Sequence, residues 1–260
     1  MRYELMLPDQ IRMAIDEGWP VALPLGVLEY HGEHMAVGMD TLAVIGILSL
    51  LEKEMDIVVL PPFYYGAASY AVEPPEGSGT LQVDAEALLP FAKAMFRGLL
   101  RIGFRNLHVI IHHQTENFPA GMPTDLAFKL AARQAIFAFL EEERGEAWWG
   151  SEKMADYYAR QSAVDDPFNW IKAHPLMTPE RMEGYPFDHA GQGETSLLMA
   201  LFPEGVDLSK AAEDKWYARS ASDASVELGI RGRERILAGL RRALSRKPGV
   251  EPAIDSPRSG

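Results

Sequence analysis

Short apolar runs alternate with longer segments of helical period along the first 145 residues. The runs that predict buried strands cover residues 21–28, 56–60 and 107–111. The segments that place apolar side chains three or four positions apart, as on one helix face, cover residues 40–51, 84–103 and 124–143. Strands that alternate with helices predict a three-layer α/β/α fold with a mostly parallel central sheet.

The second half of the chain has a less regular pattern. Tryptophans and prolines interrupt any clear period between residues 146 and 186, which is typical of a lid or a subunit contact. Two further helices are predicted over residues 194–202 and 225–244. We expect one domain over residues 1–246, followed by a disordered tail over the proline-rich residues 247–260.

Composition excludes several classes of function. The formal net charge of −12 argues against nucleic acid and anionic lipid as partners. The chain has no cysteine, so thiolate nucleophiles, iron–sulfur clusters and disulfides are all excluded. Any metal must therefore be held by nitrogen and oxygen ligands.

The sequence also predicts where the protein works. No basic segment followed by a long apolar stretch stands at the N-terminus, so no signal peptide is expected. The strongest apolar run, residues 42–51, is half of the roughly 20 residues that a membrane span requires. We expect a cytoplasmic protein without a membrane partner.

Carboxylates and imidazoles follow the predicted strands. In parallel sheets the ligand site lies beyond the carboxyl ends of the strands, so these side chains are expected to meet. Glu29 and His31 can face one cation or two adjacent ones, and Asp40 at the start of the next helix can bridge two metals. The alternative for Glu29 and His31 alone is a polar strand end. The candidate site residues are Glu29, His31, Asp40, His113, His189 and Glu194.

Four stretches of the chain resemble the signatures of the creatininase family of metal-dependent amidohydrolases. Residues 24–34 have the family's pattern Pro-x-Gly-x-x-Glu-x-His-Gly-x-His, with Asp40 nine positions after the first histidine. Residues 79–81 resemble its Gly-Thr-Leu segment. Residues 103–117, an apolar strand followed by His113 and Asn117, resemble its second signature, Asn-Gly-His-x-x-Asn. Residues 189–196 are close to its His-Ala-Gly-x-x-Glu-Thr-Ser signature. The four occur in the family's order.

The resemblance implies a ligand set for two divalent ions, zinc or manganese. Glu29 and His113 would hold one ion, His31 and Glu194 would hold the other, and Asp40 would bridge them. Two such ions lower the pKa of a shared water and so supply a bridging hydroxide at neutral pH.

The resemblance also implies an activity and an assembly. The chain would hydrolyse a non-standard amide C–N bond of a small molecule, such as a cyclic amide or lactam similar to creatinine. His189 would be the catalytic acid that protonates the leaving nitrogen. A homo-oligomer, often a hexamer in the family, is expected.

The chain departs from the family pattern near the second signature. Ile111 and His112 stand where the family has Asn-Gly, and an additional residue precedes Asn117. On a continuing strand His112 would point away from His113 and pack in the core. Glu116 would reach a metal only if its loop shifted by one residue, and His34 is expected to support the ligands rather than bind an ion.

The departures keep other functions open. One alternative keeps the fold and metals but acts on a formamide or on a modified peptide. Another is a non-catalytic metal-binding member of the family. The segment before His189, residues 185–188, lacks the family's tryptophan, which leaves the substrate open.

Overall fold

Four parallel strands form the single sheet of the computed structural model, which describes residues 1–113, 118, 120–160, 166–177, 184–186, 188–212 and 214–244. The strands are β1 (Val21–Leu25), β2 (Val58–Val59), β3 (Leu107–Ile111) and β4 (Ile171–Pro175), in the order β2-β1-β3-β4. Leu25 pairs with Ile111, and Ile111 pairs with Pro175. Because three strands end level with one another, the segments that follow them leave the sheet at the same edge.

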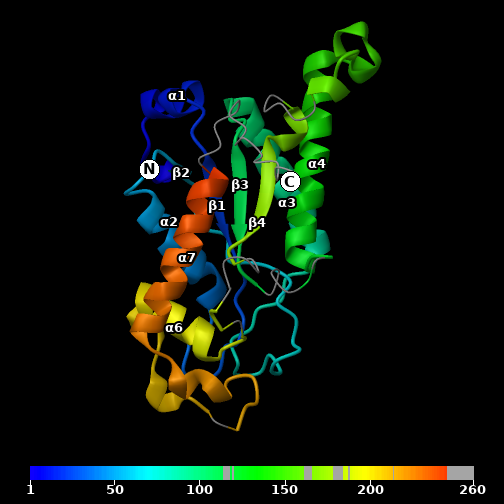
Figure 1. Ribbon diagram of the computed structural model, residues 1–260. Coiled ribbons are helices and arrows are strands. Elements are labelled where there is room, and N and C mark those ends of the chain that lie inside the picture. Colours follow the sequence, from blue (N-terminus) through cyan, green and yellow to red (C-terminus); the bar gives the residue numbers. More distant parts are fainter. Residues whose placement is uncertain are drawn as a thin grey trace, which may run out of the picture.

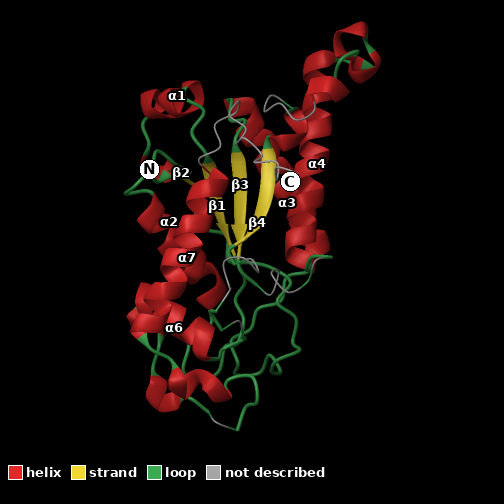
Figure 2. Ribbon diagram, in the orientation of Figure 1, coloured by secondary structure: helices red, strands yellow, loops and turns green. Residues whose placement is uncertain are grey.

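Helices cover both faces of the sheet, as the sequence predicts (Figures 1 and 2). One face carries α1 (Pro8–Asp16), α3 (Ala85–Ile102) and α4 (Pro123–Arg144), and the other carries α2 (Met39–Leu51), α6 (Gln192–Leu201) and α7 (Val226–Leu244). The strands alternate between the two cores: Val109 and Ile111 pack in the first, and Ile110 packs in the second. The three-layer α/β/α fold is therefore confirmed.

Most predicted elements form close to their expected bounds. β3 covers the predicted residues 107–111, and α3 lies between Asp84 at its N-cap and Gly103 at its C-cap. Gly103 has a φ of 124°, a conformation that glycine adopts without strain. β1 is shorter than predicted and ends at Leu25, so Glu29 and His31 lie in the loop that follows it.

The irregular segment between α4 and α6 contains a strand that its sequence does not reveal. β4 is the edge strand of the sheet and includes Lys172 and His174, and four of its five residues are only partly buried. A strand at the edge of the described sheet needs no continuous apolar run, because its side chains are covered less completely than those of a central strand. The remaining short elements are 3₁₀ turns: η1 (Tyr3–Leu5), η2 (Trp148–Gly150), η3 (Glu152–Met154), η4 (Tyr158–Arg160), η5 (Pro167–Asn169), η6 (Pro203–Gly205), η7 (Leu208–Lys210) and η8 (Arg219–Asp223).

The aromatic part of this segment lies far from the edge where β1 and β3 end. α4 starts near that edge and runs along the sheet, so η2 to η4 extend beyond the opposite end (Figure 1). There the ring of Trp149 packs against Tyr157 and Tyr158. The predicted tail over residues 247–260 lies outside the described residues. Among the helices of the described ranges, none is long and apolar enough to cross a membrane.

Candidate metal centre

One loop and one helix start bring the first ligands together at the carboxyl edge of the sheet. Glu29 and His31 follow β1, and Asp40 is the second residue of α2. A Cβ atom at Gly26 would lie 2.5 Å from the backbone nitrogen of Thr41, so only glycine lets this loop pass so close to α2. The loop is also tied to the Gly-Thr-Leu segment, because the Tyr30 amide donates to Thr80 Oγ1 at 3.0 Å.

Glu29, Asp40 and His113 form one group of ligand atoms. His113 Nδ1 lies 3.2 Å from Glu29 Oε2 and 3.3 Å from Asp40 Oδ2. These three atoms are buried and, within the described part of the chain, make no hydrogen bond despite their proximity. Ligands about 2.1 Å from a tetrahedral ion stand about 3.4 Å apart, which is close to these spacings. The group has the donor atoms and the spacing of a metal site.

His31, Asp40 and Glu194 form a second group beside the first. His31 Nε2 lies 3.5 Å from Asp40 Oδ1 and 3.6 Å from Glu194 Oε2. His31 Nδ1 donates to the Glu29 carbonyl oxygen at 3.0 Å, so the lone pair of the neutral ring is on Nε2. The two oxygens of Asp40 thus face different groups, which is the arrangement of a carboxylate that bridges two ions.

The start of α6 fixes the position of Glu194. Asp188 caps this helix, because its carboxylate accepts from the backbone N–H groups of Gly193 at 2.7 Å and Glu194 at 3.1 Å. Glu194 Oε2 accepts from the Ala190 amide at 2.7 Å. The Ala190–Glu194 bond is made within the segment that resembles the family's last signature, and Asp188 directly precedes that segment.

The cluster has an excess of buried negative charge. Glu29, His31, Asp40, His113 and Glu194 are each at most 4% exposed. Burial lowers the pKa of His31, but the charges of Asp40 and Glu194 outweigh it and raise that pKa to about 9. Burial is likewise outweighed at His113, where Asp40 and Glu29 raise the pKa to about 10.

The carboxylates respond in the opposite direction. Burial alone would raise the pKa of Asp40, yet His31 and His113 hold it well below its usual range. Three carboxylates face two imidazoles here, so the site favours cations even when both rings are protonated. Divalent metal ions satisfy both the charge and the donor types.

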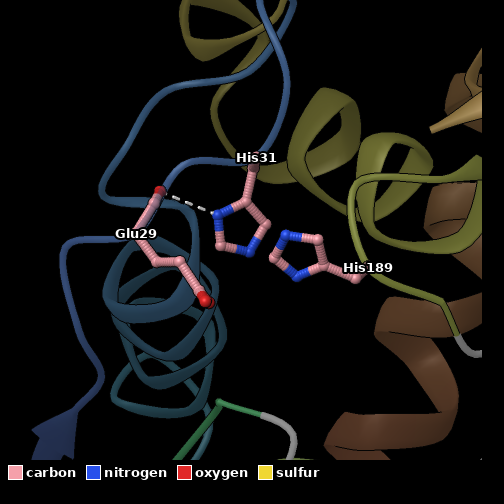
Figure 3. A group of neighbouring side chains, drawn as sticks. All are labelled: Glu29, His31 and His189. Atoms are coloured by element: carbon pink, nitrogen blue, oxygen red, sulfur yellow. Dashed lines mark hydrogen bonds between the residues drawn. The ribbon is translucent and has the colours of Figure 1, made fainter. Parts of the chain in front are cut away.

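His189 lies at the rim of this cluster and is only partly buried. Its ring is 4.4 Å from the ring of His31, and the two rings face one another beside the Glu29 carboxylate (Figure 3). His189 Nε2 donates to the Tyr30 carbonyl oxygen at 3.0 Å, which leaves Nδ1 as the unprotonated nitrogen of the neutral ring. Burial lowers the pKa of His189, and the charge of His31 lowers it further. The resemblance implies that His189 is an acid and not a ligand, but Glu29, His31 and His189 also have ligand atoms within 4.8 Å of one another.

His112 differs from the sequence prediction. It was expected to point away from His113 and to pack in the core. β3 ends at Ile111, so the alternation of side chains stops before these histidines. His112 Nε2 instead donates to Glu194 Oε1 at 3.0 Å and lies 4.0 Å from Asp40 Oδ1.

The other candidates near the signatures have varied surroundings. His34 Nε2 lies 3.0 Å from Thr195 Oγ1, and His34 belongs to none of the three ligand groups found among the described residues. Arg105, the basic residue nearest to His113 in sequence, stacks on the rings of Phe139 and Trp170. Glu116 and Asn117 lie outside the described residues.

Comparison with known proteins identifies the family. The family model described as creatinine amidohydrolase matches residues 4–245. A creatinine amidohydrolase from Pseudomonas putida is 26% identical over 198 residues, which cover 74% of this chain and 67% of that protein. A 3-dehydro-scyllo-inosose hydrolase from Thermotoga maritima is 25% identical over 205 residues; the match covers 78% of this chain but only 56% of that relative.

Solved structures share the fold. A structure described as creatinine amidohydrolase (creatininase) superposes with a TM-score of 0.70 at 21% identity, covering 94% of this chain and 96% of the other. A second, called Creatininase Mn, has a TM-score of 0.68 at 20% identity and covers 94% and 99%. Since the family model spans nearly all of the sequence, the chain belongs to the creatininase family of metal-dependent amidohydrolases.

Proposed function

We propose that this protein hydrolyses a non-standard amide C–N bond, in a cyclic amide or lactam similar to creatinine, with two divalent ions. The observation that carries the proposal is the division of Asp40: Oδ2 lies 3.3 Å from His113, and Oδ1 lies 3.5 Å from His31. One carboxylate shared by two groups of buried ligands is what a two-ion site requires. The proposed ligands are Glu29, His113, His31 and Glu194, with Asp40 as the bridge.

The ligand set limits the identity of the ions. Two imidazole nitrogens and three carboxylates suit zinc and manganese. Relatives in solved structures are called Creatininase Mn and a Zn-Zn type. Ions held in this cluster would act as Lewis acids and would lower the pKa of water toward neutral pH.

The protein's own residues have separate roles in this proposal. The deep burial of Glu29, Asp40 and Glu194 excludes bulk water from around the ligands and strengthens their attraction for cations. His189 is the only one of the six proposed site residues that is partly exposed, so it stands where a substrate would approach. Its Nε2 is held by the Tyr30 carbonyl, so Nδ1 would first take a proton from the attacking water and then deliver it to the leaving nitrogen.

A substrate screen tests the proposal. The protein, freed of metal and then reloaded with Mn²⁺ or Zn²⁺, is incubated with creatinine, other cyclic amides and lactams, formamides and modified dipeptides. We expect hydrolysis of a cyclic amide that is lost on chelation and restored by metal. Activity confined to formamides or to peptides would contradict the proposed substrate class.

Two further outcomes of the screen would reassign the function. The Thermotoga relative is named for 3-dehydro-scyllo-inosose, so hydrolysis of that compound alone would move the activity away from amides. Metal binding without turnover of any compound would favour the non-catalytic alternative. The cytoplasmic location and the homo-oligomer remain predictions from the sequence and the resemblance.

A further inference from the structure

His112 is a fully buried imidazole that contacts the proposed metal ligands without joining them. It follows β3 directly, and its Nε2 donates to Glu194 Oε1 at 3.0 Å. The opposite oxygen, Glu194 Oε2, accepts from the Ala190 amide and faces His31. The Glu194 carboxylate is therefore held at both oxygens, and only Oε2 points toward the second ligand group.

His112 is poorly placed to be an ion ligand. Its Nε2 is 4.0 Å from Asp40 Oδ1, and its proton on that nitrogen is engaged by Glu194. None of the three ligand groups found among the described residues includes it.

This position departs from the family signature. The family signature has glycine before the metal-binding histidine, and this chain has His112 at that position. A glycine has no side chain and cannot hold Glu194. The contact is therefore made by a residue that the family signature does not supply.

We propose that His112 is a positioning residue that holds Glu194 through Oε1, so that Oε2 alone is presented to the second ion. The inference rests on the proposed two-ion function. Holding Glu194 in this orientation would raise the affinity for an ion bound by His31 and Glu194. The ion held by Glu29 and His113 does not depend on this contact.

The test compares two substitutions of His112 with a matched control. His112→Gln keeps an N–H donor near the position of Nε2, and His112→Leu fills similar space without a donor. His108→Leu is the control, because His108 is a buried histidine of β3 that contacts Asn106 and His174 instead. Folding is checked by circular dichroism, and the two dissociation constants for Zn²⁺ and Mn²⁺ are measured by competition with a chromophoric chelator.

The expected result is a selective loss at one ion. In His112→Leu, one of the two dissociation constants should be roughly 10- to 100-fold larger than in the wild type, and the other should be unchanged. His112→Gln should stay within a few-fold of wild type at both ions, and His108→Leu should match wild type. A role in packing alone would not distinguish leucine from glutamine in this way.

Three results would overturn the inference: wild-type affinities in His112→Leu, equal loss in His112→Gln and His112→Leu, or equal weakening of both ions. If His112→Leu does not fold, His112→Asn takes its place, since its shorter amide does not reach Glu194. Failure of the proposed function is seen separately in the wild type. A wild-type chain that never binds two ions contradicts the function, whereas two-ion binding that His112→Leu leaves intact contradicts only this inference.

Discussion

β3 has buried histidines near its start and just after its end, and their electrostatics are opposite. Near the start, His108 Nδ1 lies 2.9 Å from His174 Nε2, and the two rings are stacked. Burial lowers the pKa of His108 well below its usual value, and the nearby charges of His174 and Lys172 lower it further. After the end, carboxylates raise the pKa of His113 to about 10 in spite of burial.

The difference shows that burial of histidine does not by itself make a metal site. The two regions share a strand, a residue type and nearly complete burial. Among the described residues, the carboxylates gather around the second region, and they arrive from the loop after β1, from α2 and from α6. The convergence of these segments at one sheet edge therefore creates the candidate cation site.

Substitution of the shared carboxylate should have the largest effect. Asp40→Asn removes the charge that both groups use, so we expect both ions to be lost or severely weakened. Metal ions contribute several kcal/mol to catalysis, so kcat/KM should fall on the order of 10⁴-fold. His108→Gln, at the other end of β3, should keep wild-type activity and metal content. Equal losses in the two variants would remove the distinction between the two regions.

Substitution of His189 should have the next largest effect. His189→Asn removes the proposed proton donor but keeps the five proposed ligands, so kcat should fall on the order of 10²- to 10³-fold while metal content stays unchanged. Steady-state kinetics and elemental analysis of the same preparation measure the two quantities. The corresponding His174→Asn variant should leave kcat unchanged. Loss of metal in His189→Asn would show that His189 is a ligand instead.

Metal binding should release protons. His31 and His113, with pKa values of about 9 and 10 before metal binds, are protonated at pH 7.5 and must become neutral to bind an ion. We expect release of about two protons when both sites fill, and an apparent affinity that increases from pH 7 to pH 9. Calorimetric titration in two buffers with different ionisation enthalpies measures the release. Binding without proton release would contradict the electrostatic account.

The smallest expected effect is the opposite pH dependence of stability at the two regions of metal-free protein. Because the pKa of His108 is lowered, its contribution to the free energy of unfolding is present above about pH 6.5 and is lost as the pH falls below that value. The raised pKa values of His31 and His113 mean that their contributions are present below about pH 6.5 and lost as the pH rises toward 9 and 10.

Urea unfolding between pH 5 and pH 9 separates these contributions. Each titrating imidazole changes the free energy of unfolding by at most about 1.4 kcal/mol per pH unit. His108→Gln should flatten the acid side of the stability curve and leave the alkaline side unchanged. An unchanged acid side would show that His108 titrates normally.

Local patterns in the sequence predict much of this fold, because the residues that form an element also carry its signal. α3 lies between Asp84 and Gly103 as expected, and β3 is a continuous apolar run. β4 escapes prediction because an edge strand tolerates Lys172, His174 and Pro175, and its partner β3 lies some 60 positions earlier in the chain.

The candidate site divides in the same way. Motif spacing brings out Glu29, His31 and Asp40, and the structure gathers them with His113 and Glu194. The contact of His112 with Glu194 was missed because it depends on where β3 ends and on a helix 82 positions away. The alternation of side chains holds only while a strand continues, and β3 ends at Ile111, directly before His112.

The most direct test of the two-ion claim is a crystal structure of the protein grown with Mn²⁺, with anomalous diffraction used to locate the ions. The account predicts two peaks about 3.5–4 Å apart. One should lie between Glu29 and His113 and the other between His31 and Glu194, with one oxygen of Asp40 on each. A single peak, or peaks that do not share Asp40, would contradict it.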